Sequence, residues 1–142
     1  MPHFCIVVAR FYEDIADEMM RGAVARLEQA GASHDFVAVP GAFEIPAAVR
    51  FAIESRKYDG YIALGCVIRG ETTHYDYVCT ESARGLNDLA MNHLAPLGYG
   101  ILTVENKEQA WERAAVGQGN KGRDAAEACL HMLALKQQWD MK

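Results

Sequence analysis

The sequence lacks the features that mark several large classes of protein. It has no apolar run long enough to span a membrane and no basic segment leading into an apolar one near Met1. Its 14 Lys and Arg residues against 19 Asp and Glu give a net charge of -5, and the basic residues form no cluster. We therefore expect a cytoplasmic protein that binds neither membranes nor nucleic acid.

Paired cysteines are also missing. The four cysteines are scattered, with neither a CxxC motif nor the spacing of metal ligands, and three of them lie inside apolar runs. Such cysteines behave as small apolar core residues, so we expect reduced thiols and neither a disulfide nor a metal site. The four residues are Cys5, Cys66, Cys79 and Cys129.

What the sequence does contain is typical of a globular domain. Apolar residues make up 51% of the 142 residues and charged residues 23%, which is enough to form a core. No linker, repeat or low-complexity tract divides the chain, so residues 1–142 are expected to form a single domain.

Short apolar runs alternate with longer amphipathic segments along the chain. The predicted strands cover residues 4–9, 36–39, 61–68 and 99–104, and the predicted helices cover residues 13–30, 43–55, 75–94, 106–115 and 123–138. Alternation of this kind is typical of a parallel sheet with right-handed crossovers. We predict a three-layer α/β/α sandwich whose four-stranded parallel sheet has the flavodoxin-like order 2-1-3-4.

Apolar spacing predicts the buried side of two helices, and one polar pair predicts a helix start. In helix 13–30 the buried residues should be Ile15, Met19, Ala23 and Leu27. In helix 75–94 they should be Cys79, Ala83, Leu86 and Ala90. Asn106 with Gln109 resembles a capping box that opens the short fourth helix.

Ligands of such sheets bind just outside the carboxyl ends of the strands. The strongest signal there is Gly70-Glu71-Thr72-Thr73-His74, which follows a predicted buried strand and opens a helix. Free N–H groups at a helix start favour an anion, and the threonine hydroxyls add donors. A simple N-cap with a glycine turn explains the same residues, and the Glu71 carboxylate would have to point away from an anion.

Each of the other candidate residues has a possible function, but taken singly each is better explained by a structural or surface role. His74 could transfer protons near neutral pH. Phe11 and Phe43 could stack on a planar ring or belong to the core, and Glu44 could bind ligand hydroxyls or complement its helix dipole. Arg113 and Lys121 suit a phosphate, but as isolated charges they would normally be surface residues.

Taken together, several segments resemble lumazine synthases. These are residues 39–46 (VPGAFEIP), 65–78 (GCVIRGETTHYDYV) and 120–122 (NKG), with residues 10–11 and 100–103 also fitting. The segments occur in the right order over essentially the whole chain, which chance matches do not do. The resemblance implies a transferase of riboflavin synthesis that needs no cofactor or metal. It would join 5-amino-6-ribitylamino-2,4(1H,3H)-pyrimidinedione to 3,4-dihydroxy-2-butanone 4-phosphate, giving 6,7-dimethyl-8-ribityllumazine.

The resemblance also implies roles for individual residues. His74 would carry protons, and Phe11 would stack on the pyrimidine ring. The ribityl chain would be bound by Ala42, Phe43 and Glu44. The pyrimidinedione edge would be bound by Val67 and Ile68, and the phosphate by Gly70, Glu71 and Thr72. A neighbouring chain would add Tyr99, Arg113 and Lys121, with Asp124 orienting Arg113.

Two residues depart from the family pattern, and two interpretations remain open beside the enzyme. Tyr12 stands where many members have Asn, and Tyr99 where Phe is common. A site shared between chains implies a homo-oligomer, either a pentamer or an assembly of pentamers. A receiver domain is excluded because the first and third strands end in Arg10 and Arg69 rather than in acids. A flavodoxin-like carrier and a non-catalytic paralogue that binds flavin or lumazine, or forms cages, are the alternatives.

Overall fold

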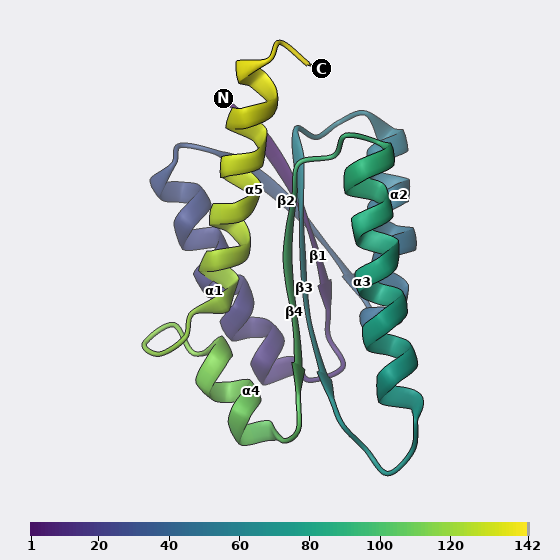
Figure 1. Ribbon diagram of the computed structural model, residues 1–142. Helices are drawn as coiled ribbons and strands as arrows, with labels where there is room; N and C mark the ends of the chain where they lie inside the picture. The colour runs from purple at the N-terminus through teal and green to yellow at the C-terminus, as the bar shows by residue number, and fades with distance from the viewer. Residues whose placement is uncertain (142) are drawn as a thin grey trace.

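The computed structural model describes residues 1–141, in which the strands form one parallel sheet (Figure 1). The strands are β1 (His3–Ala9), β2 (Ser33–Val39), β3 (Gly60–Ile68) and β4 (Leu97–Val104). All pairings are parallel and the order is β2-β1-β3-β4, which confirms the predicted topology. β1 and β3 are the inner strands, and β2 and β4 form the two edges.

Helices cover both faces of the sheet, so the predicted three-layer sandwich is confirmed (Figure 1). The helices are α1 (Glu13–Gln29), α2 (Ile45–Ser55), α3 (His74–Asn92), α4 (Lys107–Ala114) and α5 (Lys121–Gln138), with a 3₁₀ turn η1 (Ala42–Glu44) before α2. α1, α4 and α5 lie on one side of the sheet, and α2 and α3 lie on the other. No helix within residues 1–141 has the length and apolar character needed to cross a membrane.

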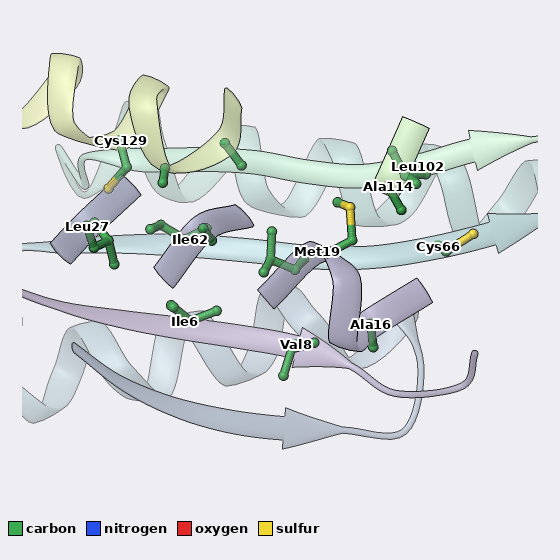
Figure 2. Packing of buried hydrophobic residues seen from close by; sticks show 14 of the residues in the cluster. Ile6, Val8, Ala16, Met19, Leu27, Ile62, Cys66, Leu102, Ala114 and Cys129 are labelled. Atoms are coloured by element: carbon green, nitrogen blue, oxygen red, sulfur yellow. The ribbon is translucent and has the colours of Figure 1, made fainter. Parts of the chain in front are cut away.

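The inner strands are apolar on both sides because each side faces a helical layer. Ile6 and Val8 of β1 point into the core beneath α1 and α5, together with Ile62 of β3 (Figure 2). Cys5 and Val7 point to the opposite side, into the core beneath α2 and α3. Continuous apolar runs are therefore expected for β1 and β3.

The α1 helix follows the predicted pattern. The four residues predicted to be buried have no exposed surface, and Met19 and Leu27 lie in the core shown in Figure 2. The helix ends before Gly31, whose φ of 71° is the left-handed conformation that glycine adopts without steric cost. The four residues are Ile15, Met19, Ala23 and Leu27.

The predicted buried side of α3 is wrong in part. The buried residues are Val78, Ser82, Leu86 and Leu89, so only Leu86 was predicted. Ala83 is exposed, whereas Cys79 and Ala90 are partly buried. Apolar spacing passed over Ser82, whose hydroxyl donates a 3.2 Å hydrogen bond to the carbonyl oxygen of Cys79 and so can be buried in the helix.

The buried thiols lead to a testable expectation about reactivity. Burial raises the pKa of Cys5 and of Cys66 to about 11, and that of Cys129 to about 12. A raised pKa leaves less of the reactive thiolate at pH 8. We therefore expect iodoacetamide at pH 8 to leave these three thiols unmodified in the native protein, while all four cysteines react in denaturant. Mass spectrometry of the peptides checks this, and rapid native labelling of Cys129 would show that α5 opens readily.

Candidate functional site

Three loops leave the carboxyl ends of neighbouring strands and lie at one end of the sheet (Figure 1). The Arg10 N–H donates to the Val39 carbonyl oxygen at 3.0 Å, which holds the exits of β1 and β2 together. The Arg69 N–H donates to the Val104 carbonyl oxygen at 2.9 Å, which does the same for β3 and β4. The sheet thus brings residues 10–12, 40–44 and 69–74 to the same end of the sheet.

The loop at residues 70–73 presents unused backbone donors. Within residues 1–141, no N–H group of Gly70, Glu71, Thr72 or Thr73 donates a hydrogen bond. All four residues are exposed, and nothing lies within 4 Å of the place where a side chain on Gly70 would begin. Because α3 starts at His74, these donors lie at the positive end of a 19-residue helix, where an anion is favoured.

The N-cap interpretation of this loop has partial support. Thr73 occupies the N-cap position, yet its side chain makes no capping hydrogen bond. The Thr72 hydroxyl instead accepts a long hydrogen bond, 3.3 Å, from the His74 N–H. His74 itself is exposed at the first position of α3, so its ring is open to a ligand bound at the loop.

Two aromatic side chains at the strand exits are exposed and do not belong to either core. Phe11 has 73% of its surface exposed and Phe43 has 54%. Phe11 packs edge-to-face on Tyr12, with ring centroids 4.9 Å apart and planes at 79°. Because most of the Phe11 surface is exposed, stacking on a planar ligand is sterically open.

The η1 turn places Ala42 inside and Glu44 outside. Ala42 is buried in the core beneath α2 and α3, which ties the turn to the sheet. The Glu44 carboxylate accepts a 3.0 Å hydrogen bond from the Gly41 N–H, so it has a local structural role at the start of η1. A carboxylate has two oxygens and several lone pairs, so this bond leaves acceptor capacity for a ligand.

The carboxyl end of β3 carries backbone groups without a partner strand on one side. β1 pairs with β3 only from Phe4–Gly60 to Val8–Leu64, whereas β4 pairs with β3 as far as Ile68. Beyond Leu64, the side of β3 that faces β1 is therefore unpaired. Val67 and Ile68, which are half-buried, lie in this segment, where main-chain groups are available to a ligand edge.

Tyr99, Arg113 and Lys121 gather in a second place, along the free edge of β4. They line one hollow of about 350 Å³ together with Asp124 and residues 100–103 of β4. Gly98 lets α5 come this close, because a Cβ there would lie 1.9 Å from the Ala125 carbonyl oxygen. None of the three loops described above contributes to this lining within residues 1–141.

The start of α4 and the partner of Asp124 can be compared directly with the predictions. The predicted cap is confirmed, since the Asn106 side chain accepts from the Gln109 N–H at 2.8 Å. The reciprocal bond of a capping box is replaced by another, because the Gln109 side chain accepts at 2.8 Å from the Glu105 N–H and not from that of Asn106. Asp124 pairs with Lys121 at 3.2 Å, not with Arg113 as predicted. The reason is local: the two residues are three apart on α5, and Arg113 donates to its own helix, at Gln109.

Sequence reasoning missed two side chains that support these loops. Arg69, directly before the 70–73 loop, pairs with Glu105 across the ends of β3 and β4. Tyr12, which was noted only as a departure, supports Phe11 and has the Lys107 ammonium 5.9 Å from its ring centroid. The sequence signal that could have identified Arg69 is its place beside Gly70, at the end of a predicted strand.

Comparisons with known proteins agree with this architecture. The model of the family described as 6,7-dimethyl-8-ribityllumazine synthase matches residues 2–137. The proteins of that name from Bartonella tribocorum and Azorhizobium caulinodans are 56% and 57% identical over 139 and 136 residues. These alignments cover 97% and 92% of this chain, and 92% and 84% of the relatives. The chain therefore belongs to the 6,7-dimethyl-8-ribityllumazine synthase family.

Proposed function

We propose that this protein condenses 5-amino-6-ribitylamino-2,4(1H,3H)-pyrimidinedione with 3,4-dihydroxy-2-butanone 4-phosphate to give 6,7-dimethyl-8-ribityllumazine, releasing phosphate and water. Membership of the family is the first support for this reaction. The structural observation that carries it is the loop of residues 70–73, whose free N–H groups open α3 beside the other strand exits. That loop suits the phosphate of the ketone substrate.

The second substrate is flat and carries a polyhydroxyl chain. The exposed ring of Phe11 would stack on the pyrimidine, and the unpaired backbone at Val67 and Ile68 would bind its polar edge. Phe43 and Glu44 would contact the ribityl chain, next to Ala42. An apolar face with a few polar groups at its rim is the usual composition of such a pocket.

His74 would move protons while the amine attacks the ketone, water leaves to give the imine, phosphate is eliminated, and the second ring closes with loss of a further water. General acid–base catalysis contributes about 10²–10⁴-fold. Holding two reactants in line contributes more, about 7–11 kcal/mol in the best-aligned cases. We therefore assign the larger part of the rate enhancement to positioning by the loops and the smaller part to His74.

We further propose that the complete site forms between two copies of the chain. In one chain the three loops and the hollow along β4 are separate, so Tyr99, Arg113 and Lys121 would serve the loops of a neighbour. A head-to-tail arrangement of this kind forms a ring where its rotation closes, and the ring that we propose from the family resemblance is a pentamer or an assembly of pentamers. We also propose that residues 1–142 form one domain and that the enzyme works in the cytoplasm.

The reaction itself is tested by mixing the two substrates with the purified protein and following lumazine absorbance. We expect formation of lumazine well above the rate of the uncatalysed reaction. A folded, oligomeric protein that binds lumazine without accelerating its formation would instead be the non-catalytic paralogue.

Replacing Arg113 with alanine is expected to raise the KM for the phosphorylated ketone about tenfold, because a charge-assisted contact to phosphate is lost. The KM for the pyrimidinedione should change little. Steady-state kinetics with each substrate varied in turn separates the two constants. Arg123 is a matched control, since it lies on α5, pairs with Gln29 and does not line the hollow; if R123A and R113A behave alike, the role of Arg113 is wrong.

A further inference from the structure

The Arg69 side chain contacts three residues from two parts of the fold, directly before the 70–73 loop. Its Nε lies 3.0 and 3.1 Å from the two carboxylate oxygens of Glu105, which follows β4. Its Nη1 lies 3.6 Å from an oxygen of Asp76, and its guanidinium carbon lies 4.3 Å from the ring centroid of Tyr75. Asp76 and Tyr75 belong to the first turn of α3, directly after the loop.

The loop needs this support because it makes few stabilising contacts of its own. Its N–H groups make no hydrogen bonds within residues 1–141, and its residues are all exposed. Arg69 directly precedes the loop, and its side chain contacts Tyr75 and Asp76, which follow the loop. These flanking residues, Arg69 and residues 74–76, are the neck of the loop. The Arg69 side chain therefore links the two sides of the neck and, through Glu105, connects the neck to the end of β4.

We propose that Arg69 is a positioning residue that fixes the neck of the 70–73 loop, so that the loop N–H groups converge on the substrate phosphate and His74 faces the reacting atoms. The inference rests on the proposed function, because it concerns the same loop. Arg69 acts through the loop and does not itself touch the substrate.

The contacts of Arg69 argue against two other roles. Its charge is already matched by the carboxylates of Glu105 and Asp76, and one face of its guanidinium lies on Tyr75, which leaves it poorly disposed to bind a phosphate directly. A role in stability alone is also a poor explanation. The side chains of Arg69 and Glu105 are 43% and 54% exposed, and exposed ion pairs contribute little to folding.

Kinetics of R69A and E105Q, alone and combined, test the proposal. We expect each single change to raise the KM for the phosphorylated ketone about fivefold, with the KM for the pyrimidinedione and the melting temperature unchanged. The double variant should be no worse than either single one, because both remove the same support. R84A is the matched control, since Arg84 pairs, like Arg69, with two carboxylates, those of Glu81 and Asp88, each at 2.8 Å, and lies on α3 away from the loop.

Amide exchange provides a readout that needs no turnover. The N–H groups of Asp76 and Tyr77 donate to the Thr73 carbonyl oxygen at 2.9 and 3.4 Å, so they report on the loop neck. We expect faster exchange at both in R69A and in E105Q, and no change in R84A. If wild type forms no lumazine while exchange responds, the proposed function fails and the positioning role stands. Unchanged exchange and KM in both variants, or a KM raised by R69A alone, would overturn the positioning role.

Discussion

Replacing His74 with alanine is expected to lower kcat about a hundredfold and to leave measurable activity. The value lies at the low end for acid–base catalysis because no other side chain orients the His74 ring: within residues 1–141 it has no hydrogen-bond partner. The three loops would still hold both substrates in line, and that positioning is the larger contribution. Single-turnover and steady-state rates of lumazine formation give the value.

A control separates loss of chemistry from loss of structure. His131 is also on a helix, α5, and lies away from the strand exits, so H131A should keep the wild-type kcat. Both variants should melt at the wild-type temperature, because His74 is exposed and belongs to neither core. An H74A protein with unchanged kcat would remove His74 from the mechanism.

Replacing Gly122 with alanine is expected to lower the free energy of unfolding by about 3 kcal/mol, the upper end of typical overpacking effects. A Cβ on Gly122 would lie 2.0 Å from the carbonyl oxygen of Met19, and 2.8 Å from its carbonyl carbon. These are backbone atoms of α1, so no side-chain rotation relieves the clash and the two helices must move apart. The gain in helix propensity from glycine to alanine, about 1 kcal/mol, is too small to compensate.

Thermal unfolding at a fixed protein concentration measures the effect, which corresponds to a melting temperature about 10 °C lower. Gly117 offers a matched control a few residues earlier. Nothing lies within 4 Å of its Cβ position and its φ is not left-handed, so G117A should be neutral or slightly stabilising. Equal stabilities of G122A and G117A would mean that α1 and α5 do not pack as closely as described.

The fold could largely be predicted because its signals are local. The apolar run of β1 and the four-residue spacing in α1 depend on residues close together in the sequence, and the parallel order follows from chirality rules. The side of α3 that is buried depends instead on what packs against it. Gly85 lets α2 approach, since a Cβ there would lie 2.9 Å from Pro46, and no pattern within α3 contains that information.

The candidate site divides in the same way. The loops after β1, β2 and β3 could be predicted, because strand ends and motif residues coincide there. The pairing of Arg69 with Glu105 joins residues 36 positions apart and appears only once β3 and β4 are aligned. The hollow along β4 likewise depends on how closely α5 approaches Gly98, so its three residues looked like separate surface charges or aromatics in the sequence.

The central claim is that loops of one chain and the β4 hollow of another form each site, and mixing two impaired variants tests it directly. H74A and R113A carrying different tags should be co-expressed and the mixed oligomer purified, then assayed at low concentration of the phosphorylated ketone. Because a random mixture pairs intact His74 with intact Arg113 at some interfaces, activity should recover to about one quarter of wild type. Activity equal to the mean of the two separate variants would contradict a shared site.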